Sequence, residues 1–257
     1  MVKAILFDIS GVLHVDNNPL PGAVATVSRL QEIGLPIRFV TNTSRSTCSD
    51  ILASMRRMGF SVEQQDIFTA PLAIKQVCLE RQLRPYCLIH PQLEPEFADL
   101  EQAEPNAVII ADAAERFDYH HLNKAFSLLI QGAPLLGIGR NRYFKSGGEL
   151  QMDAGPFIQA LEYAADTEAE ILGKPAAGFF RAAVSSLGCT EADVLMIGDD
   201  VEADVLGAVD AGLQACLVRT GKYLPKDEQK LTTAMVADSV VDAVKQFVSL
   251  DQRCHGY

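Results

Sequence analysis

The stretch AILFDISGVL, residues 4–13, is the part of the sequence from which the fold and the site are inferred. Its first four residues form a short apolar run, which is typical of a buried parallel strand, and the run ends on Asp8. Gly11 allows a sharp turn just beyond the strand. A carboxylate at the end of a buried strand is costly to desolvate unless a charged group meets it. A lone aspartate here would be interpreted as a turn or cap residue, so the ends of the later strands decide the question.

Apolar runs alternate with helix-like stretches along the remainder of the chain. Besides the first strand, strands are predicted at residues 37–40, 86–89, 107–110, 135–138, 170–172, 194–197 and 215–218. Helices are predicted between them at 21–34, 51–58, 122–130 and 179–187, with a last one that has Val240, Val244, Phe247 and Val248 on one side. This alternation predicts an α/β fold with a doubly wound, parallel, Rossmann-like sheet. We expect a core domain of residues 1–72 and 169–257 and an inserted smaller α/β cap domain of residues 73–168.

The composition is that of an ordinary globular chain, with 257 residues of which 48% are hydrophobic and 21% charged. The formal net charge of −11 argues against a nucleic-acid partner and against binding to anionic membranes, because both need a basic surface. The first predicted strand leaves no room for a signal peptide, and no apolar run is long enough to span a bilayer. The six cysteines form neither a CxxC pair nor a zinc-ligand spacing. We therefore expect a cytoplasmic protein.

Four predicted strands of the core sheet lead directly into polar residues, namely Asp8, Thr41, Lys174 and Asp199. In an open parallel sheet, ligands bind outside the carboxyl ends of the strands, so we expect these four side chains to converge on one crevice. A simpler interpretation makes Lys174 a surface residue before a turn proline and Asp200 a helix cap. That interpretation leaves the other strand ends unexplained, so we favour a shared site.

The two carboxylates of this site suit a divalent cation. Asp8 and Asp199 would repel each other, and Mg²⁺ is commonly bound by one or two carboxylates together with phosphate and water. Asp204, five residues after Asp199, is expected behind the metal ligands. Asp8 would then act as a nucleophile that forms an aspartyl-phosphate, which water later cleaves.

The remaining polar residues suit a phosphate group. Lys174 offers a positive point charge for the phosphate or for the nucleophile. Thr41 and Asn42 offer a hydroxyl and an amide, and the N-terminus of the helix that follows favours an anion. The residue types at the four strand ends therefore predict phosphoryl transfer.

The four segments resemble, in order, the motifs of the haloacid dehalogenase (HAD) superfamily of phosphatases: Asp8-x-x-Gly11, Thr41, Lys174-Pro175 and Gly198-Asp199-Asp200. The insert between the second and third motifs resembles the α/β cap of the C2 type, and the resemblance covers nearly the whole chain. Further stretches resemble a subgroup that acts on phosphohistidine, on phospholysine and on inorganic pyrophosphate, namely residues 8–13, 108–112, 160–164 and 218–222. The resemblance implies a Mg²⁺-dependent phosphatase that cleaves P–N and P–O–P bonds through an aspartyl-phosphate.

The resemblance also implies a role for each site residue. Asp8 would be the nucleophile and a Mg²⁺ ligand, with the backbone carbonyl of Ser10 and a side-chain oxygen of Asp199 as further ligands. The substrate phosphate would be held by Asp8, Ile9, Ser10, Thr41, Asn42 and Lys174, of which Asp8, Ser10 and Lys174 are expected to take part in catalysis.

Ser10 departs from the superfamily pattern, in which a second aspartate usually acts as general acid and base. The backbone ligand to the metal survives this replacement, but the proton donor, which contributes about 10²–10⁴-fold to the rate, is lost. One alternative is therefore a catalytically weak or silent protein that has kept the fold for interactions with other proteins.

Two further alternatives are a phosphatase for another small phosphorylated metabolite and a phosphorylation-accepting receiver module. The order of the polar residues and the large insert fit the receiver module poorly. The expected partners are a small phosphorylated substrate or a phospho-amino acid and, by resemblance, a second copy of the chain paired through the cap as a homodimer.

Overall fold

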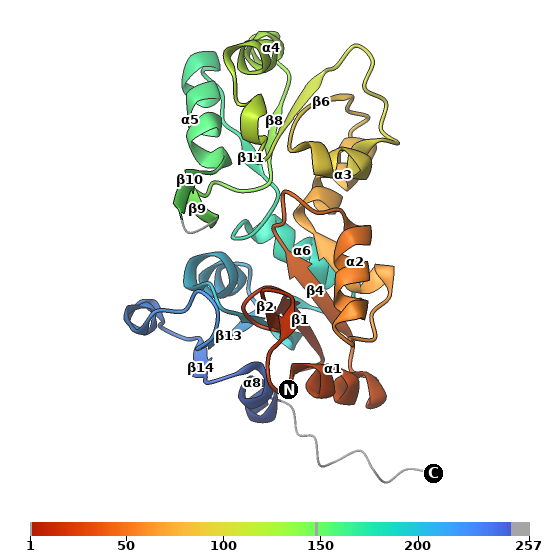
Figure 1. Ribbon diagram of the computed structural model, residues 1–257, viewed down its shortest axis with the longest axis vertical. Helices are drawn as coiled ribbons and strands as arrows, with labels where there is room; N and C mark the ends of the chain where they lie inside the picture. The colour runs from red at the N-terminus through yellow and green to blue at the C-terminus, as the bar shows by residue number, and fades with distance from the viewer. Residues whose placement is uncertain (1, 147–148, 248–257) are drawn as a thin grey trace. The chain divides into compact units, whose positions relative to one another are not determined.

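The computed structural model describes residues 2–146 and 149–247, which form two compact units (Figure 1). The first unit comprises Met1–Thr41, Ser49–Phe68 and Lys174–Tyr257, and the second comprises Asn42–Cys48 and Thr69–Gly173. That these units are separately folding core and cap domains, with boundaries after residues 72 and 168, stays a prediction. Among the described residues, none of the helices combines the length and apolar character that a bilayer crossing requires.

The first unit is built on a six-stranded sheet in the order β14-β13-β12-β1-β4-β5. Its strands are β1 Ala4–Asp8, β4 Ile37–Thr41, β5 Ile67–Thr69, β12 Val194–Gly198, β13 Gln214–Val218 and β14 Met235–Ala237. Strand β1 pairs in parallel with both β4 and β12, and β13 pairs in parallel with both β12 and β14. All residues of β1 and β12 are buried, as expected for central strands of a parallel sheet. The strand order reverses at β1, so the sheet is doubly wound as predicted.

Helices of the first unit follow its strands along the chain. They are α1 Ala23–Glu32, α2 Cys48–Arg57, α6 Ala177–Ser185, α7 Gly207–Asp210 and α8 Val240–Phe247, with the π-helix η5 Val201–Leu206 and the 3₁₀ turns η1 Gln64–Asp66, η4 Glu191–Asp193 and η6 Pro225–Lys230. Helix α1 packs against α8, and α6 packs against α7. A small hairpin, β2 His14–Val15 with β3 Asn18–Pro19, comes shortly after β1. Val248, placed on the last helix by the sequence, and Cys254 lie outside the described residues.

The second unit has a four-stranded parallel sheet in the order β11-β8-β7-β6. Its elements are β6 Pro85–Leu88, β7 Ala107–Ile110, β8 Leu135–Gly137, β11 Glu170–Ile171, the hairpin β9 Tyr143–Ser146 with β10 Glu149–Met152, the helices α3 Ala70–Glu80, α4 Tyr119–Leu129 and α5 Ala154–Ala165, and the 3₁₀ turns η2 Pro91–Phe97 and η3 Ala114–Arg116. Helices α4 and α5 pack together over an apolar core that includes Ile110, Leu135 and Ile158. Beside it the Phe117 ring stacks on the Phe157 ring, with 3.7 Å between their centroids.

The structure corrects the prediction that residues 170–172 form a strand of the core sheet. Strand β11 pairs with β8 and therefore belongs to the sheet of the second unit. Ile171 pairs with Gly137 of β8, and its side chain packs over this glycine, where a Cβ would lie 2.8 Å from the end of the Ile171 side chain. A strand of two residues has too little pattern to indicate its sheet. Lys174 consequently follows no strand of the first unit and lies in the loop that leads to α6.

Candidate active site

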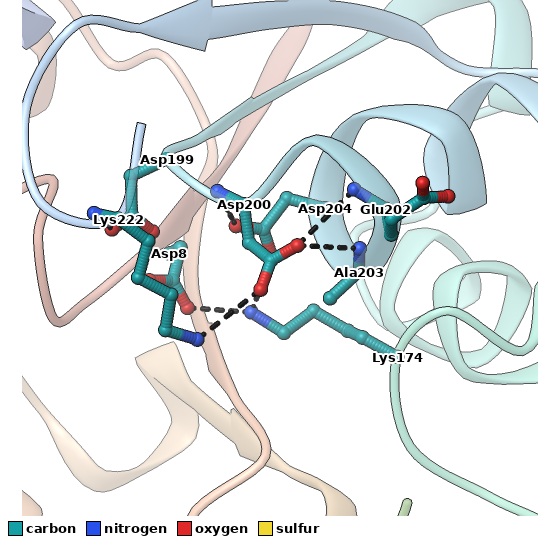
Figure 2. Close-up of polar contacts among 8 residues, drawn as sticks. All are labelled: Asp8, Lys174, Asp199, Asp200, Glu202, Ala203, Asp204 and Lys222. Atoms are coloured by element: carbon teal, nitrogen blue, oxygen red, sulfur yellow. Dashed lines mark hydrogen bonds and ion pairs between the residues drawn. The ribbon is translucent and has the colours of Figure 1, made fainter. Parts of the chain in front are cut away.

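Two carboxylates meet where the strand order of the first unit reverses. Asp8 is the last residue of β1, and Asp199 follows the last residue of the neighbouring strand β12. Asp204 joins them from η5, and carboxylate oxygens of the three residues lie within 4.8 Å of one another (Figure 2). All three side chains are buried. This position, at the carboxyl ends of strands beside the reversal, is where doubly wound sheets bind their ligands.

Lys174 lies between two of these carboxylates. Its Nζ donates to Oδ1 of Asp8 at 2.5 Å and to Oδ1 of Asp204 at 2.6 Å, and only 5% of the side chain is exposed. Burial alone would lower the pKa of Lys174, but the carboxylates of Asp204 and Asp8 raise it above its ordinary value. The ammonium therefore stays charged and holds the two acids in place.

Two glycines enclose the carboxylate of Asp199. A Cβ on either Gly11 or Gly221 would lie 2.0 Å from Oδ2 of Asp199, so no larger residue fits beside that oxygen. Both glycines also have positive φ angles, of 87° and 60°. The backbone N–H of Lys222 donates to the same Oδ2 at 2.7 Å. The hydroxyl of Thr220 donates to the carbonyl of Gly11 at 2.5 Å, which joins the loop after β13 to the loop after β1.

One carboxylate oxygen of Asp199 is available to a metal ion. Its Oδ1 is one of two buried side-chain polar atoms without a hydrogen-bond partner among the described residues, the other being Nδ1 of His14. Burial and the nearby Asp8 carboxylate raise the pKa of Asp199 to about 7. An unpartnered carboxylate oxygen next to a second buried carboxylate is the environment that a divalent cation relieves. The residues present therefore fit a metal ion such as Mg²⁺.

Asp204 differs from Asp199 because both of its oxygens already have partners. Oδ1 accepts from Lys174, and Oδ2 accepts from the backbone N–H of Asp200 at 3.2 Å. Burial raises the pKa of Asp204 to about 6, although Lys174 acts in the opposite direction. One oxygen of Asp204 thus positions Lys174, and the place of Asp204 behind the metal ligands stays a prediction.

The other predicted residues lie around this cluster or outside the first unit. Ile9 is buried and Ser10 is exposed, directly after Asp8 on the loop. Thr41 ends β4, whose Val40 pairs with Asp8. Asn42 belongs to the second unit, where it lines a cavity of about 20 Å³ together with Asp112, Asp153 and neighbouring residues. The parts assigned to Ile9, Ser10, Thr41 and Asn42 in substrate or metal binding stay predictions.

Sequence reasoning missed the part of the site that comes from the loop after β13. Thr220, Gly221 and Lys222 all contact the Asp8–Asp199 region, although none of them is among the predicted site residues. The available signal was that this loop follows a fifth strand at the same edge of the sheet. Asp200, by contrast, caps η5 as the simpler interpretation holds, because its Oδ1 accepts from the N–H groups of Glu202 and Ala203.

Comparison with known proteins gives a consistent result. A family model described as haloacid dehalogenase-like hydrolase matches residues 5–102, and a HAD-hydrolase-like model matches residues 171–243. The chain is 41% identical over 233 residues to haloacid dehalogenase-like hydrolase domain-containing protein 2 of Bos taurus, which covers 91% of this chain and 90% of that protein.

The chain is also 40% identical over 256 residues to phospholysine phosphohistidine inorganic pyrophosphate phosphatase of Xenopus laevis, covering 97% of this chain and 94% of that one. Among solved structures, p-nitrophenyl phosphatase from Archaeoglobus fulgidus is similar with a TM-score of 0.87 and 25% identity. That similarity covers 95% of this chain and 99% of the other.

Proposed function

This chain belongs to the haloacid dehalogenase-like hydrolase family, and we propose that it is a Mg²⁺-dependent phosphatase in which Asp8 becomes phosphorylated. The observation that supports this proposal most directly is the environment of Asp8. Its carboxylate ends the central strand, 2.5 Å from the ammonium of Lys174 and beside the unpartnered oxygen of Asp199. A carboxyl group held in one orientation by a buried ammonium suits nucleophilic attack on phosphorus.

Asp8, Asp199 and the backbone carbonyl of Ser10 would hold the Mg²⁺ ion. When bound, the ion would neutralise charge on the carboxylates and on the phosphate oxygens. Asp199 is held for this task by the N–H of Lys222, and the two glycines beside it keep other side chains away.

Each site residue has its own role in the proposed two-step reaction. A carboxylate oxygen of Asp8 forms a bond to phosphorus as the bond to the leaving group breaks, and the leaving group takes the electron pair. Water afterwards attacks the same phosphorus, which releases phosphate and restores Asp8. Lys174 keeps its proton throughout and keeps Asp8 oriented, with Asp204 fixing the ammonium on the other side. Thr41 and Asn42 are proposed to donate to the phosphate oxygens.

Ser10 argues for a particular class of leaving group. A serine hydroxyl is too weak an acid to protonate a leaving alkoxide near neutral pH, so alkyl phosphates should be poor substrates. The phosphate that leaves pyrophosphate is a much weaker base, and the nitrogen of a phosphoramidate can take its proton from water. We therefore propose phosphohistidine, phospholysine and inorganic pyrophosphate as the substrate class, in line with the name of the Xenopus laevis relative.

A panel of substrates tests this proposal. The native chain should release phosphate from p-nitrophenyl phosphate, a phosphohistidine analogue and pyrophosphate with Mg²⁺, and the rate should vanish in excess chelator. Ser10 also supports a second candidate, a catalytically silent interaction protein. Absence of turnover on the whole panel, with Mg²⁺ binding intact, would favour that candidate.

A further inference from the structure

We propose that the side chain of Lys222 binds the leaving phosphate of a P–O–P substrate and so favours pyrophosphate over substrates whose leaving group carries less charge. This inference rests on the proposed function, because it concerns the leaving group of the same reaction. Two observations support it: the backbone of Lys222 is fixed at the site, and its ammonium is exposed and weakly bound.

The backbone of Lys222 is part of the site. Its N–H donates to Asp199 Oδ2 at 2.7 Å, and the residue before it, Gly221, faces the same oxygen. Thr220 ties the loop to Gly11 through a hydrogen bond of 2.5 Å. The Cα of Lys222 is therefore held close to the Asp8–Asp199 pair whatever its side chain does.

The side chain of Lys222 has only a weak hold on its present partner. Nζ lies 3.2 Å from Oδ2 of Asp200, and 70% of the side chain is exposed. Exposed ion pairs of this length contribute little, because water screens them and both side chains must be ordered. If Lys222 turns away, Oδ1 of Asp200 keeps its two backbone N–H donors from η5, and only Oδ2 loses the contact with Lys222. The Lys222 ammonium can thus turn from Asp200 to an incoming anion with little loss of free energy.

Lys174 provides the contrast. Figure 2 shows the two lysines reaching the carboxylates from opposite sides, with Lys174 bonded to both Asp8 and Asp204. Only 5% of the Lys174 side chain is exposed, so moving it would leave two buried carboxylates without their cation. Of these two ammonium groups, Lys222 is the one that can follow a group on the substrate.

The charges of the cluster suggest what the Lys222 ammonium does during the reaction. Asp8, Asp199, Asp200 and Asp204 contribute four negative charges when ionised, and the two lysines contribute two positive ones. One divalent cation would balance the remainder, so the phosphates of a substrate add negative charge that the cluster does not balance. An ammonium that turns toward the leaving phosphate would attract that charge locally. In the proposed step, the bridging P–O bond breaks and its electrons stay on the bridging oxygen. The product phosphate therefore gains charge as it leaves, and Lys222 neutralises it.

The test compares Lys222→Met with Lys230→Met in the full chain. Lys230 is a matched control, because its Nζ also forms an exposed ion pair with an acidic residue, at 2.6 Å from Glu202 in the first turn of η5. We expect Lys222→Met to lower the ratio of kcat/KM for pyrophosphate to kcat/KM for p-nitrophenyl phosphate by roughly five- to tenfold. Lys230→Met should leave the ratio unchanged, and Lys222→Arg should retain most of it.

A binding measurement separates this inference from the proposed function. In an Asp8→Asn background, calorimetry should show that Lys222→Met weakens pyrophosphate binding several-fold more than orthophosphate binding. Equal losses for both substrates and both anions would overturn the inference and leave Lys222 as a support for Asp199. A native chain without any phosphatase activity would instead contradict the proposed function, and the binding comparison would still decide the role of Lys222.

Discussion

The ammonium of Lys174 lies 2.5 Å from Oδ1 of Asp8, although the two residues are separated by most of the chain and come from different kinds of element. Asp8 ends a central strand, whereas Lys174 lies in a loop after the last strand of the second unit. The second contact of Lys174, to Asp204, makes this ammonium the link between β1 and η5. The stability of the fold and the orientation of the nucleophile therefore depend on the same cation.

Replacing Lys174 by methionine should lower both the stability of the fold and the phosphatase activity. The change leaves Asp8 and Asp204 buried without their cation, and breaking a buried ion pair in this way costs about 3–5 kcal/mol. Urea denaturation should show a loss of that size, with phosphatase activity abolished. Lys230→Met, which removes an exposed ion pair, should change the unfolding free energy by less than about 1 kcal/mol. Equal stability of the two variants would contradict the assignment.

Substitutions of Asp199 and of Asp204 should have different effects on Mg²⁺ affinity. Asp199→Asn replaces the carboxylate that carries the unpartnered Oδ1 by a neutral amide, so Mg²⁺ affinity measured by calorimetry should fall by at least about tenfold. Asp204→Asn should lower stability, because Lys174 loses one of its two carboxylates, while Mg²⁺ affinity changes less. The reverse pattern would show that Asp204 is the metal ligand.

The metal-free protein should lose stability as the pH rises toward neutrality. The pKa of Asp199 is raised from 3.8 to about 7 by burial and by Asp8, so between these values the folded chain binds more protons than the unfolded chain. Stability therefore falls across this pH range, and added Mg²⁺ should reverse the effect at the upper end. The Tm of Asp199→Asn, measured without metal, should depend less on pH than that of the native chain. Parallel Tm curves would contradict the raised pKa.

Gly11→Ala should be far more damaging than Gly34→Ala. Both glycines have positive φ angles, but a Cβ at Gly11 would lie 2.0 Å from Asp199 Oδ2, whereas nothing lies within 4 Å of a Cβ at Gly34. The control variant measures the cost of the backbone conformation, about 1 kcal/mol, and the difference measures the clash with Asp199. We expect a further loss of stability in Gly11→Ala and a loss of Mg²⁺ affinity that Gly34→Ala does not show.

Ser10→Asp should shift the substrate preference toward alkyl phosphates, because it restores a carboxylic acid near the leaving group. A general acid contributes about 10²–10⁴-fold where the leaving group is a strong base, and little where it is a weak one. The comparison is the ratio of rates on an unactivated alkyl phosphate and on pyrophosphate. An unchanged ratio would show that Ser10 does not limit the native chain.

Much of the fold was predictable because short apolar runs, separated by helix-like stretches, mark the buried strands. The pattern around β1 and β12 predicts that Asp8 and Asp199 emerge at one edge of the sheet, and the structure has them there. Lys174 also lies in this cluster, but not for the predicted reason, since β11 pairs in the other sheet. A two-residue strand has no periodicity from which its partner could be inferred.

The contribution of Gly221 and Lys222 was not predictable in the same way. Gly221 matters because of its close approach to Asp199, and Lys222 binds that residue through its backbone N–H. The interaction of Lys222 uses the main chain, and although residues 218–222 resemble a family stretch, that resemblance does not say what Gly221 approaches. Contacts made by the main chain become visible only once the register of β12 and β13 is known.

The central claim is that phosphate passes through Asp8. Mass spectrometry of the native chain, quenched in acid during turnover of p-nitrophenyl phosphate, tests it most directly. We predict one additional phosphoryl group on the peptide that contains Asp8, removed by hydroxylamine and absent from Asp8→Asn. That variant should be less stable, because Lys174 loses one of its two carboxylates, but it should still fold and be inactive. Near-normal turnover by Asp8→Asn, or a phosphoryl group on another residue, would contradict the claim.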